Sequence, residues 1–288
     1  MIHKKNNLAL VLAGGGGRGA YQIGVWKYLK EAGIDKKISA FAGTSVGALN
    51  ACLIAQDDYE LAEYIWTKEI KDKILKADTK IISSIVHEID KSLLKKQNPL
   101  MSLPAIISLL QANGTFSREG LLEIIDKYVD LEKIALNKKP IFGTCVSLKD
   151  FKPQYLKLND CEAKRIKSIL CATSAIPFVF PPEPIDGIEY VDGGIQKIGD
   201  NVPVKILYEQ GYKNILVVHL DAKAHIDKAN FPNANIIEIC PEKKLGNAIT
   251  GVLDFSAKGA KQRMEMGYLD AKNCLQALDK DITLILNS

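Results

Sequence analysis

The stretch that decides the fold is Ile38-Ser-Ala-Phe-Ala-Gly-Thr-Ser45-Val-Gly-Ala-Leu-Asn50. Its apolar first half predicts a short buried strand, and a helix is expected over residues 48–56. Between them, Gly43 and Gly47 flank Ser45 with the G-x-S-x-G spacing of a nucleophile elbow. Such a turn holds the serine side chain clear of the backbone, and the helix N-terminus offers N–H groups to an oxyanion. The motif alone also fits an ordinary strand–helix connection that carries a serine.

The composition is that of a soluble globular protein. The 288 residues are 47% hydrophobic and 25% charged, which is enough to bury a substantial core. The net charge of +4 is too small to indicate nucleic acid, and we expect no nucleic-acid partner. The six cysteines are scattered, form no C-x-x-C pair and do not cluster with the four histidines, so we predict neither a disulfide framework nor a metal site.

The order of elements predicts an α/β protein. Apolar strands alternate with helices, which indicates a mainly parallel central sheet in a three-layer α/β/α arrangement. We predict a single domain over residues 1–288, with a helical insertion at about 57–135 and a C-terminal helix at about 257–278. No apolar run approaches the roughly 18 residues of a membrane span. We therefore expect a cytoplasmic protein and leave peripheral membrane contact and the oligomeric state open.

A glycine-rich loop, Gly14-Gly-Gly-Gly-Arg-Gly19, follows the first strand and precedes a helix over residues 20–32. It matches G-x-G-x-x-G, so a nucleotide-binding module is one hypothesis. However, the next strand ends in Ser45 and not near an acidic residue that could bind a ribose. The other hypothesis is an oxyanion hole, in which backbone N–H groups at the helix start face one concavity and Arg18 adds charge or braces the loop.

Two further segments could belong to a lipid site. Residues 57–120 combine an expected helix, Glu60–Lys76, a lysine-rich run, Lys68–Lys96, and an apolar stretch, Leu100–Leu110. We favour ordinary packing with a solvated lysine face over a lid or an acyl-chain channel. The prolines of Ser174–Pro182 predict a rigid loop, for which an acyl pocket and simple core cover are equally good interpretations.

A serine nucleophile needs a base, and two residues are candidates. The order Ser45, Asp192, His219 is that of an α/β-hydrolase triad. His219, however, lies inside the apolar run of residues 215–220, which favours a structural role. Asp192 ends a strand before two glycines, where parallel sheets place functional loops. Because an ordinary carboxylate is a weak base, burial would have to raise its pKa.

Three motifs together, Gly14–Gly19, Gly43–Gly47 and Asp192-Gly193-Gly194, resemble the signatures of the patatin-like phospholipase family. The similarity extends through Ser174–Pro182 and Asn201–Pro203, although the segment between Gly194 and Asn201 is longer than that family's pattern suggests. The resemblance implies a Ser–Asp dyad that cleaves acyl esters of phospholipids or other lipids without metal or cofactor. The residues it implies are the nucleophile Ser45, the base Asp192, the elbow glycines Gly43 and Gly47, and the oxyanion loop Gly15, Gly16, Gly17 and Arg18.

We therefore expect a serine lipid acyl hydrolase of phospholipase A or lysophospholipase type that acts through an acyl-enzyme. Transfer of the acyl group to another alcohol stays open, as do the head group and the acyl position. The alternatives are a Ser–Asp–His esterase that uses His219, a nucleotide-binding module that uses Gly14–Gly19, and a relative that binds lipid without turnover.

Overall fold

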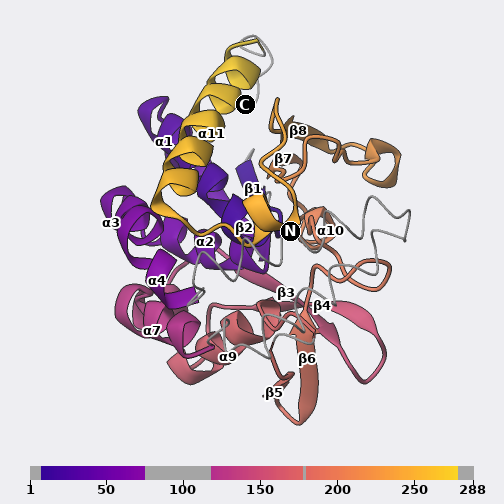
Figure 1. Ribbon diagram of the computed structural model, residues 1–288. Helices are drawn as coiled ribbons and strands as arrows, with labels where there is room; N and C mark the ends of the chain where they lie inside the picture. Colours follow the sequence, from indigo (N-terminus) through magenta and orange to yellow (C-terminus); the bar gives the residue numbers. More distant parts are fainter. Residues whose placement is uncertain (1–7, 75–117, 178–179, 278–288) are drawn as a thin grey trace, which may run out of the picture.

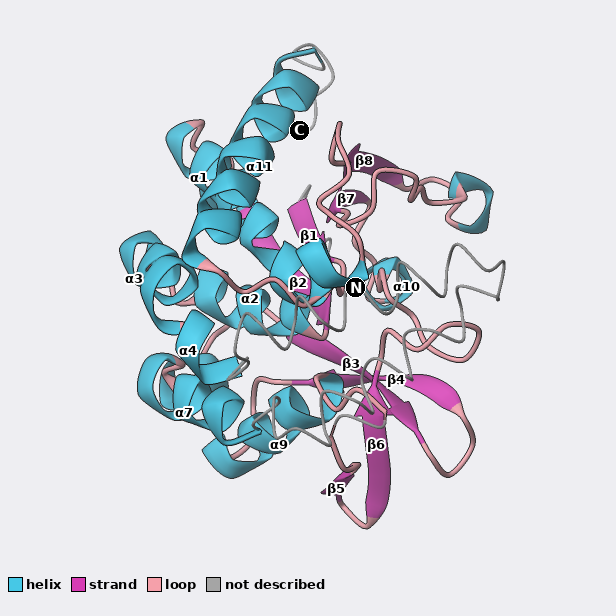
Figure 2. Cartoon of the chain, viewed as in Figure 1, coloured by secondary structure: helices cyan, strands magenta, loops and turns pink. Residues whose placement is uncertain are grey.

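The computed structural model describes residues 8–74, 118–177 and 180–277. In these residues an eight-stranded sheet carries helices on both faces (Figures 1 and 2). The strands are β1 Leu8–Leu12, β2 Ile38–Thr44, β3 Ile141–Ser147, β4 Lys152–Lys157, β5 Glu183–Ile185, β6 Ile188–Asp192, β7 Asn214–Val218 and β8 Asn235–Ile239.

The sheet is parallel in its main part and antiparallel at one end. Its strand order is β5-β6-β3-β2-β1-β7-β8, and β4 pairs with β3 beside this path. The pairs β3–β2, β2–β1, β1–β7 and β7–β8 are parallel. The pairs β3–β4, β3–β6 and β5–β6 are antiparallel. The predicted mainly parallel α/β sheet is confirmed, with an antiparallel extension that the alternation of elements did not indicate.

Most helices cover one face of the sheet. Figure 1 shows α1, α2, α3, α7 and α11 on one side of the strands and the short α10 on the other. The helices are α1 Ala20–Glu31, α2 Val46–Ala55, α3 Tyr59–Tyr64, α4 Lys71–Ile74, α7 Arg118–Tyr128, α8 Leu131–Ala135, α9 Ala163–Thr173, α10 Val204–Glu209 and α11 Ala257–Ala277. Shorter helical segments are the 3-10 turns Gly16–Gly19, Asp35–Lys37 and Lys228–Asn230 and the π-helical turns Ile65–Glu69 and Ala248–Val252.

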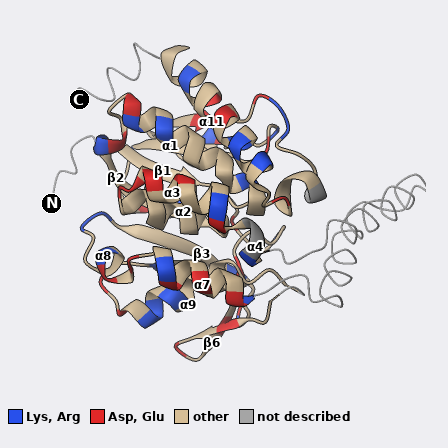
Figure 3. Cartoon of the chain, turned by 60° about the vertical axis from the view of Figure 1, so that its left-hand side comes forward, with Lys and Arg blue, Asp and Glu red and all other residues tan. Residues whose placement is uncertain are grey.

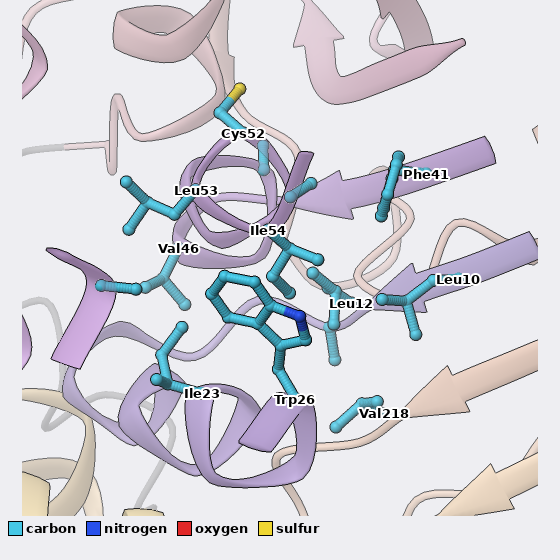
Figure 4. Close-up of a cluster of buried hydrophobic side chains, with 14 of the residues drawn as sticks. Leu10, Leu12, Ile23, Trp26, Phe41, Val46, Cys52, Leu53, Ile54 and Val218 are labelled. Carbon is cyan, nitrogen blue, oxygen red and sulfur yellow. The ribbon is translucent and has the colours of Figure 1, made fainter. Parts of the chain in front are cut away.

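The two faces of the sheet have cores of different size because strand side chains alternate between them. In β1, Leu10 and Leu12 belong to the large cluster under the helices, while Ala9 and Val11 belong to the smaller cluster under α10. Figure 4 shows the large cluster, in which the buried Trp26 of α1 lies among side chains of β1, β2 and α2. The three layers are therefore present, and the layer that contains α10 is thin.

The inserted region is only partly described. The expected helix Glu60–Lys76 appears as α3, a π-helical turn and α4, and the stretch Leu100–Leu110 lies outside the described residues. Figure 3 colours the positions of basic residues blue and of acidic residues red, and the two kinds are interspersed along the helices. Within the ranges that the structure describes, no helix combines the length and apolar character needed to cross a bilayer.

Candidate active site

Ser45 lies in the sharp turn between β2 and α2. Its backbone angles are φ 54° and ψ −124°, a conformation that residues with a side chain rarely adopt. Close packing imposes this turn, since a Cβ on Gly47 would lie 2.2 Å from the carbonyl oxygen of Leu12. A Cβ on Gly43 would in turn lie 2.3 Å from the Gly47 backbone, so the strand and the helix start touch directly. The elbow expected from the sequence is therefore present, with a half-buried Ser45 at its tip.

Sheet register brings Asp192 beside Ser45. Thr44, the last residue of β2, pairs with Thr144, and the next residue of β3, Cys145, pairs with Asp192. The Ser45 side chain lies close enough to the Asp192 carboxylate to stabilise its charged form. The backbone N–H of Gly194 donates to Oδ1 of the same carboxylate over 2.7 Å. Residues 147 positions apart in the chain are thus in direct contact.

The environment of Asp192 makes it a stronger base than an ordinary carboxylate. The residue is only 6% exposed, and burial raises the pKa of its carboxyl group to about 6. The hydrogen bonds from Gly194 and Ser45 act in the opposite direction, because they stabilise the charged form, but burial outweighs them.

The strand that carries Asp192 runs in a direction that differs from the sequence-based expectation. The sequence suggested the end of a parallel strand, but β6 runs antiparallel to β3 and ends beside its middle. The chain then turns immediately, and a Cβ on Gly193 would lie 2.3 Å from the carbonyl oxygen of Thr144. Glycine is therefore needed after Asp192 because the turn passes directly over β3.

The glycine-rich loop lies next to the elbow. A Cβ on Gly14 would lie 3.4 Å from the Cβ of Ser45, and residues Gly16–Gly19 form a 3-10 turn that continues into α1. Within the described residues, the N–H of Gly14 donates to Asn201 and that of Arg18 donates to Gly15, whereas no acceptor is recorded for the N–H groups of residues 15–17. These N–H groups can therefore donate to a ligand beside Ser45.

The Arg18 side chain attaches the glycine-rich loop to two segments that are distant in the chain. Its guanidinium donates to the carbonyl oxygen of Gly246 over 2.8 Å and to that of Leu220 over 3.5 Å. Burial lowers the pKa of the guanidinium, Asp221 raises it and the neighbouring Arg263 lowers it further. Of the two roles that the sequence left open for Arg18, these contacts match the brace.

Two residues that sequence reasoning did not single out connect the parts of the site. Asn201 accepts a backbone hydrogen bond from Gly14 over 3.1 Å and donates its side-chain amide to the Gly14 carbonyl over 3.2 Å. Thr173, at the end of α9, accepts from the Ser45 N–H over 2.9 Å and donates to the Thr144 carbonyl over 2.6 Å. Asn201 therefore joins the loop to the chain after Asp192, and Thr173 joins the elbow to β3.

An apolar pocket opens at Ser45. It encloses about 740 Å³ of space, a figure that includes the part open to solvent. Helix α2, the segment from the π-helical turn to α4, and α7 contribute most of its wall. The described lining residues are Gly16, Ser45, Val46, Leu49, Asn50, Leu53, Ile65, Trp66, Ile70, Ile74, Leu121, Ile124, Val129, Ser174, Ile176, Phe180 and Phe255. Parts of segment 57–120, for which ordinary packing was the favoured interpretation, and of the loop 174–182 thus line the pocket.

His219 has a different partner. It is fully buried, and its Nε2 lies 2.9 Å from Oε2 of Glu238 on β8, not at Asp192. Burial lowers the pKa of its imidazole, while the Glu238 carboxylate raises it. His219, Glu238 and Cys240 each offer one potential metal-ligand atom, and these three atoms lie within 4.8 Å of one another. The sequence did not suggest that a histidine and a cysteine cluster, because the parallel pairing of β7 with β8 creates this contact.

Comparison with known proteins agrees with the geometry. The family model described as Patatin-like phospholipase matches residues 10–208. Lysophospholipase nte1 of Aspergillus terreus is 53% identical over 51 residues, which are 18% of this chain and 3% of that protein. Patatin-like phospholipase domain-containing protein 7 of Rattus norvegicus is 24% identical over 231 residues, 80% of this chain and 15% of that protein. The chain thus spans a small part of the length of these curated relatives.

Among solved structures, VipD from Legionella pneumophila matches 94% of this chain and 67% of its own, with a TM-score of 0.56 and 16% identity. At this identity the likeness shows a shared fold and does not carry a substrate.

Proposed function

Because the chain belongs to the patatin-like phospholipase family, we propose that it is a serine lipid acyl hydrolase with Ser45 as nucleophile and Asp192 as base. The observation that carries the proposal is that the Ser45 side chain, in the wall of an apolar pocket, lies beside the buried Asp192 carboxylate and stabilises its charged form. The relatives whose names include phospholipase or lysophospholipase support a lipid ester as substrate.

The proposed chemistry has two halves. Ser45 Oγ attacks the ester carbonyl carbon while its proton passes to Asp192, and the carbonyl oxygen becomes an oxyanion. The N–H groups of residues 15–17, which have no acceptor among the described residues, donate to that oxyanion. Collapse breaks the bond to the alcohol oxygen, which takes the proton from Asp192. Water then attacks the acyl-enzyme and gives a proton to Asp192, and Ser45 regains a proton as the fatty acid leaves.

The pKa of Asp192 suits this role. A base with a pKa near 6 is ionised at neutral pH, and it accepts the serine proton more readily than a carboxylate with an ordinary pKa. The apolar pocket would hold the acyl chain, and the head group would stay outside the pocket. The proposal also includes a cytoplasmic location, contact with a membrane surface and acyl transfer to another alcohol as a second outcome of the acyl-enzyme.

A labelling and turnover experiment tests the function. A fluorophosphonate probe should label wild type and not Ser45→Ala, and hydrolysis of phospholipids and lysophospholipids should fall at least ~1000-fold in Ser45→Ala. His219→Ala should keep the activity of the folded protein, because His219 bonds Glu238 and not the dyad. Labelling that survives in Ser45→Ala, or activity that depends on His219 but not on Asp192, would contradict the proposed dyad.

A further inference from the structure

The hydroxyl of Ser174 is a buried polar group that the proposed mechanism does not use. Ser174 is 8% exposed, and its Oγ has no hydrogen-bond partner among the described residues. It forms part of the wall of the apolar pocket together with Ser45. A buried hydroxyl without a partner loses its hydrogen bonds to water and destabilises the folded state. A bound molecule that supplied a partner would remove this destabilisation.

The other polar side chains in the described pocket wall already have partners. The side-chain amide of Asn50 donates to Gly19 and Gln22 and accepts from Trp66. The Ser45 hydroxyl is the proposed nucleophile and lies beside the Asp192 carboxylate. Ser174 is therefore the side chain of this wall whose hydrogen-bonding capacity is available to a ligand.

Ser174 lies at the catalytic end of the pocket. It directly follows Thr173, whose hydroxyl accepts a hydrogen bond from the Ser45 N–H over 2.9 Å. An acyl chain has polar atoms only at its ester end, so a hydroxyl placed here can meet only the ester or the water that replaces the alcohol. In the proposed function the glycine-rich loop binds the carbonyl oxygen of the ester. The acceptor that remains for the Ser174 hydroxyl is therefore the alcohol oxygen of the ester.

We propose that the Ser174 hydroxyl donates a hydrogen bond to the leaving alcohol oxygen of the ester, and afterwards binds the water that attacks the acyl-enzyme. One position serves both, since the water must approach the acyl carbon along the path by which the alcohol left. The proton balance is unchanged, because Asp192 still gives its proton to the alcohol and receives one from the water. This inference rests on the proposed function and adds a substrate-binding residue to it.

The test compares two esters of the same fatty acid in wild type, Ser174→Ala and Ser45→Ala. A nitrophenyl ester releases a phenolate that is stable without help, whereas an alkyl ester releases an alkoxide that needs a donor. We expect Ser174→Ala to lower kcat/KM about 10- to 100-fold for the alkyl ester and much less for the nitrophenyl ester. The midpoint of urea unfolding should stay the same or rise, since the variant removes an unpaired buried hydroxyl.

Ser39→Ala is the matched control. The Ser39 hydroxyl donates to the Leu8 carbonyl at the start of β2, so its loss should lower stability and leave both kcat/KM values unchanged. Equal losses for the two esters, no loss in Ser174→Ala, or a Ser174→Ala protein that is less stable than wild type would each overturn the inference alone. Wild type that shows no Ser45-dependent hydrolysis of either ester would overturn the proposed function and this inference with it.

Discussion

Replacing Asp192 with asparagine should abolish ester hydrolysis and stabilise the fold above pH 6. The buried carboxyl group has a pKa of about 6, about two units above its ordinary value of 3.8. At about 1.36 kcal/mol per unit, ionised Asp192 destabilises the folded state by about 3 kcal/mol. The residue is 6% exposed, so solvent screening reduces this figure little.

The titration of Asp192 determines whether the unfolding free energy rises or falls with pH. Between pH 3.8 and about 6, folded Asp192 holds a proton that the unfolded chain has released. The stability of the wild type therefore falls as pH rises through this window and stays lower above it. Asparagine does not titrate, and any change in its hydrogen bonds with Gly194 and Ser45 adds an offset that is independent of pH. The unfolding free energy of Asp192→Asn minus that of wild type should thus rise by about 3 kcal/mol from pH ~3.5 to pH ~8.

Urea unfolding of wild type and variant across this pH range measures the difference. Asp254→Asn is a control of opposite sign. Burial of Asp254 acts to raise the pKa of its carboxyl group, but hydrogen bonds from Ser256 and Arg263 outweigh burial and lower it. Asp254→Asn should therefore lose stability at neutral pH, and the loss should shrink as pH falls through the folded-state pKa.

Wild-type kcat/KM supplies an independent measurement of the same group. If Asp192 must be ionised to accept the serine proton, kcat/KM should fall about tenfold per pH unit below pH ~6 and level off above it. A stability difference that does not change with pH, or one that falls as pH rises, would refute the argument that burial raises the pKa of Asp192.

Two further predictions concern the elbow and its support. Ser45→Gly should be more stable than Ser45→Ala by about 1 kcal/mol in urea unfolding. Both variants lack the hydroxyl, and only glycine adopts φ 54° without strain. An alanine variant of equal or higher stability would contradict a strained elbow. Thr173→Val should lose about 1–3 kcal/mol of stability and at least ~10-fold in kcat with little change in KM, and Thr173→Ser should restore both, because the hydroxyl links Ser45 to Thr144. A valine variant with full kcat would argue against positioning by Thr173.

Local chemistry explains which parts of the site could be predicted from the sequence. The elbow needs glycine at two positions near one serine, so Gly43, Ser45 and Gly47 carry their own structural signal. The glycine-rich loop and the turn after Asp192 are of the same kind, since each requires close backbone approach within a few residues. These features were recognisable because the physical requirement and the residues that meet it are adjacent in the chain.

Contacts between distant segments explain what could not be predicted. The antiparallel direction of β6 depends on its pairing with β3 and not on the residues of β6 itself. Thr173 lies 128 positions from Ser45, and Asn201 lies 187 positions from Gly14. A threonine at a helix end and an asparagine two residues before a proline have many ordinary roles, so neither residue type indicates its partner.

The site is also where the chain departs from the rules that stabilise a fold. Ser45 has a backbone conformation suited to glycine, Asp192 is a buried carboxyl group, and Ser174 has a buried hydroxyl without a partner. Each departure destabilises the folded state; Ser45 and Ser174 line one apolar pocket, and Asp192 lies beside Ser45. A nucleophile, a base and a substrate donor have to lie close together, and replacing each of the three residues should exchange activity for stability.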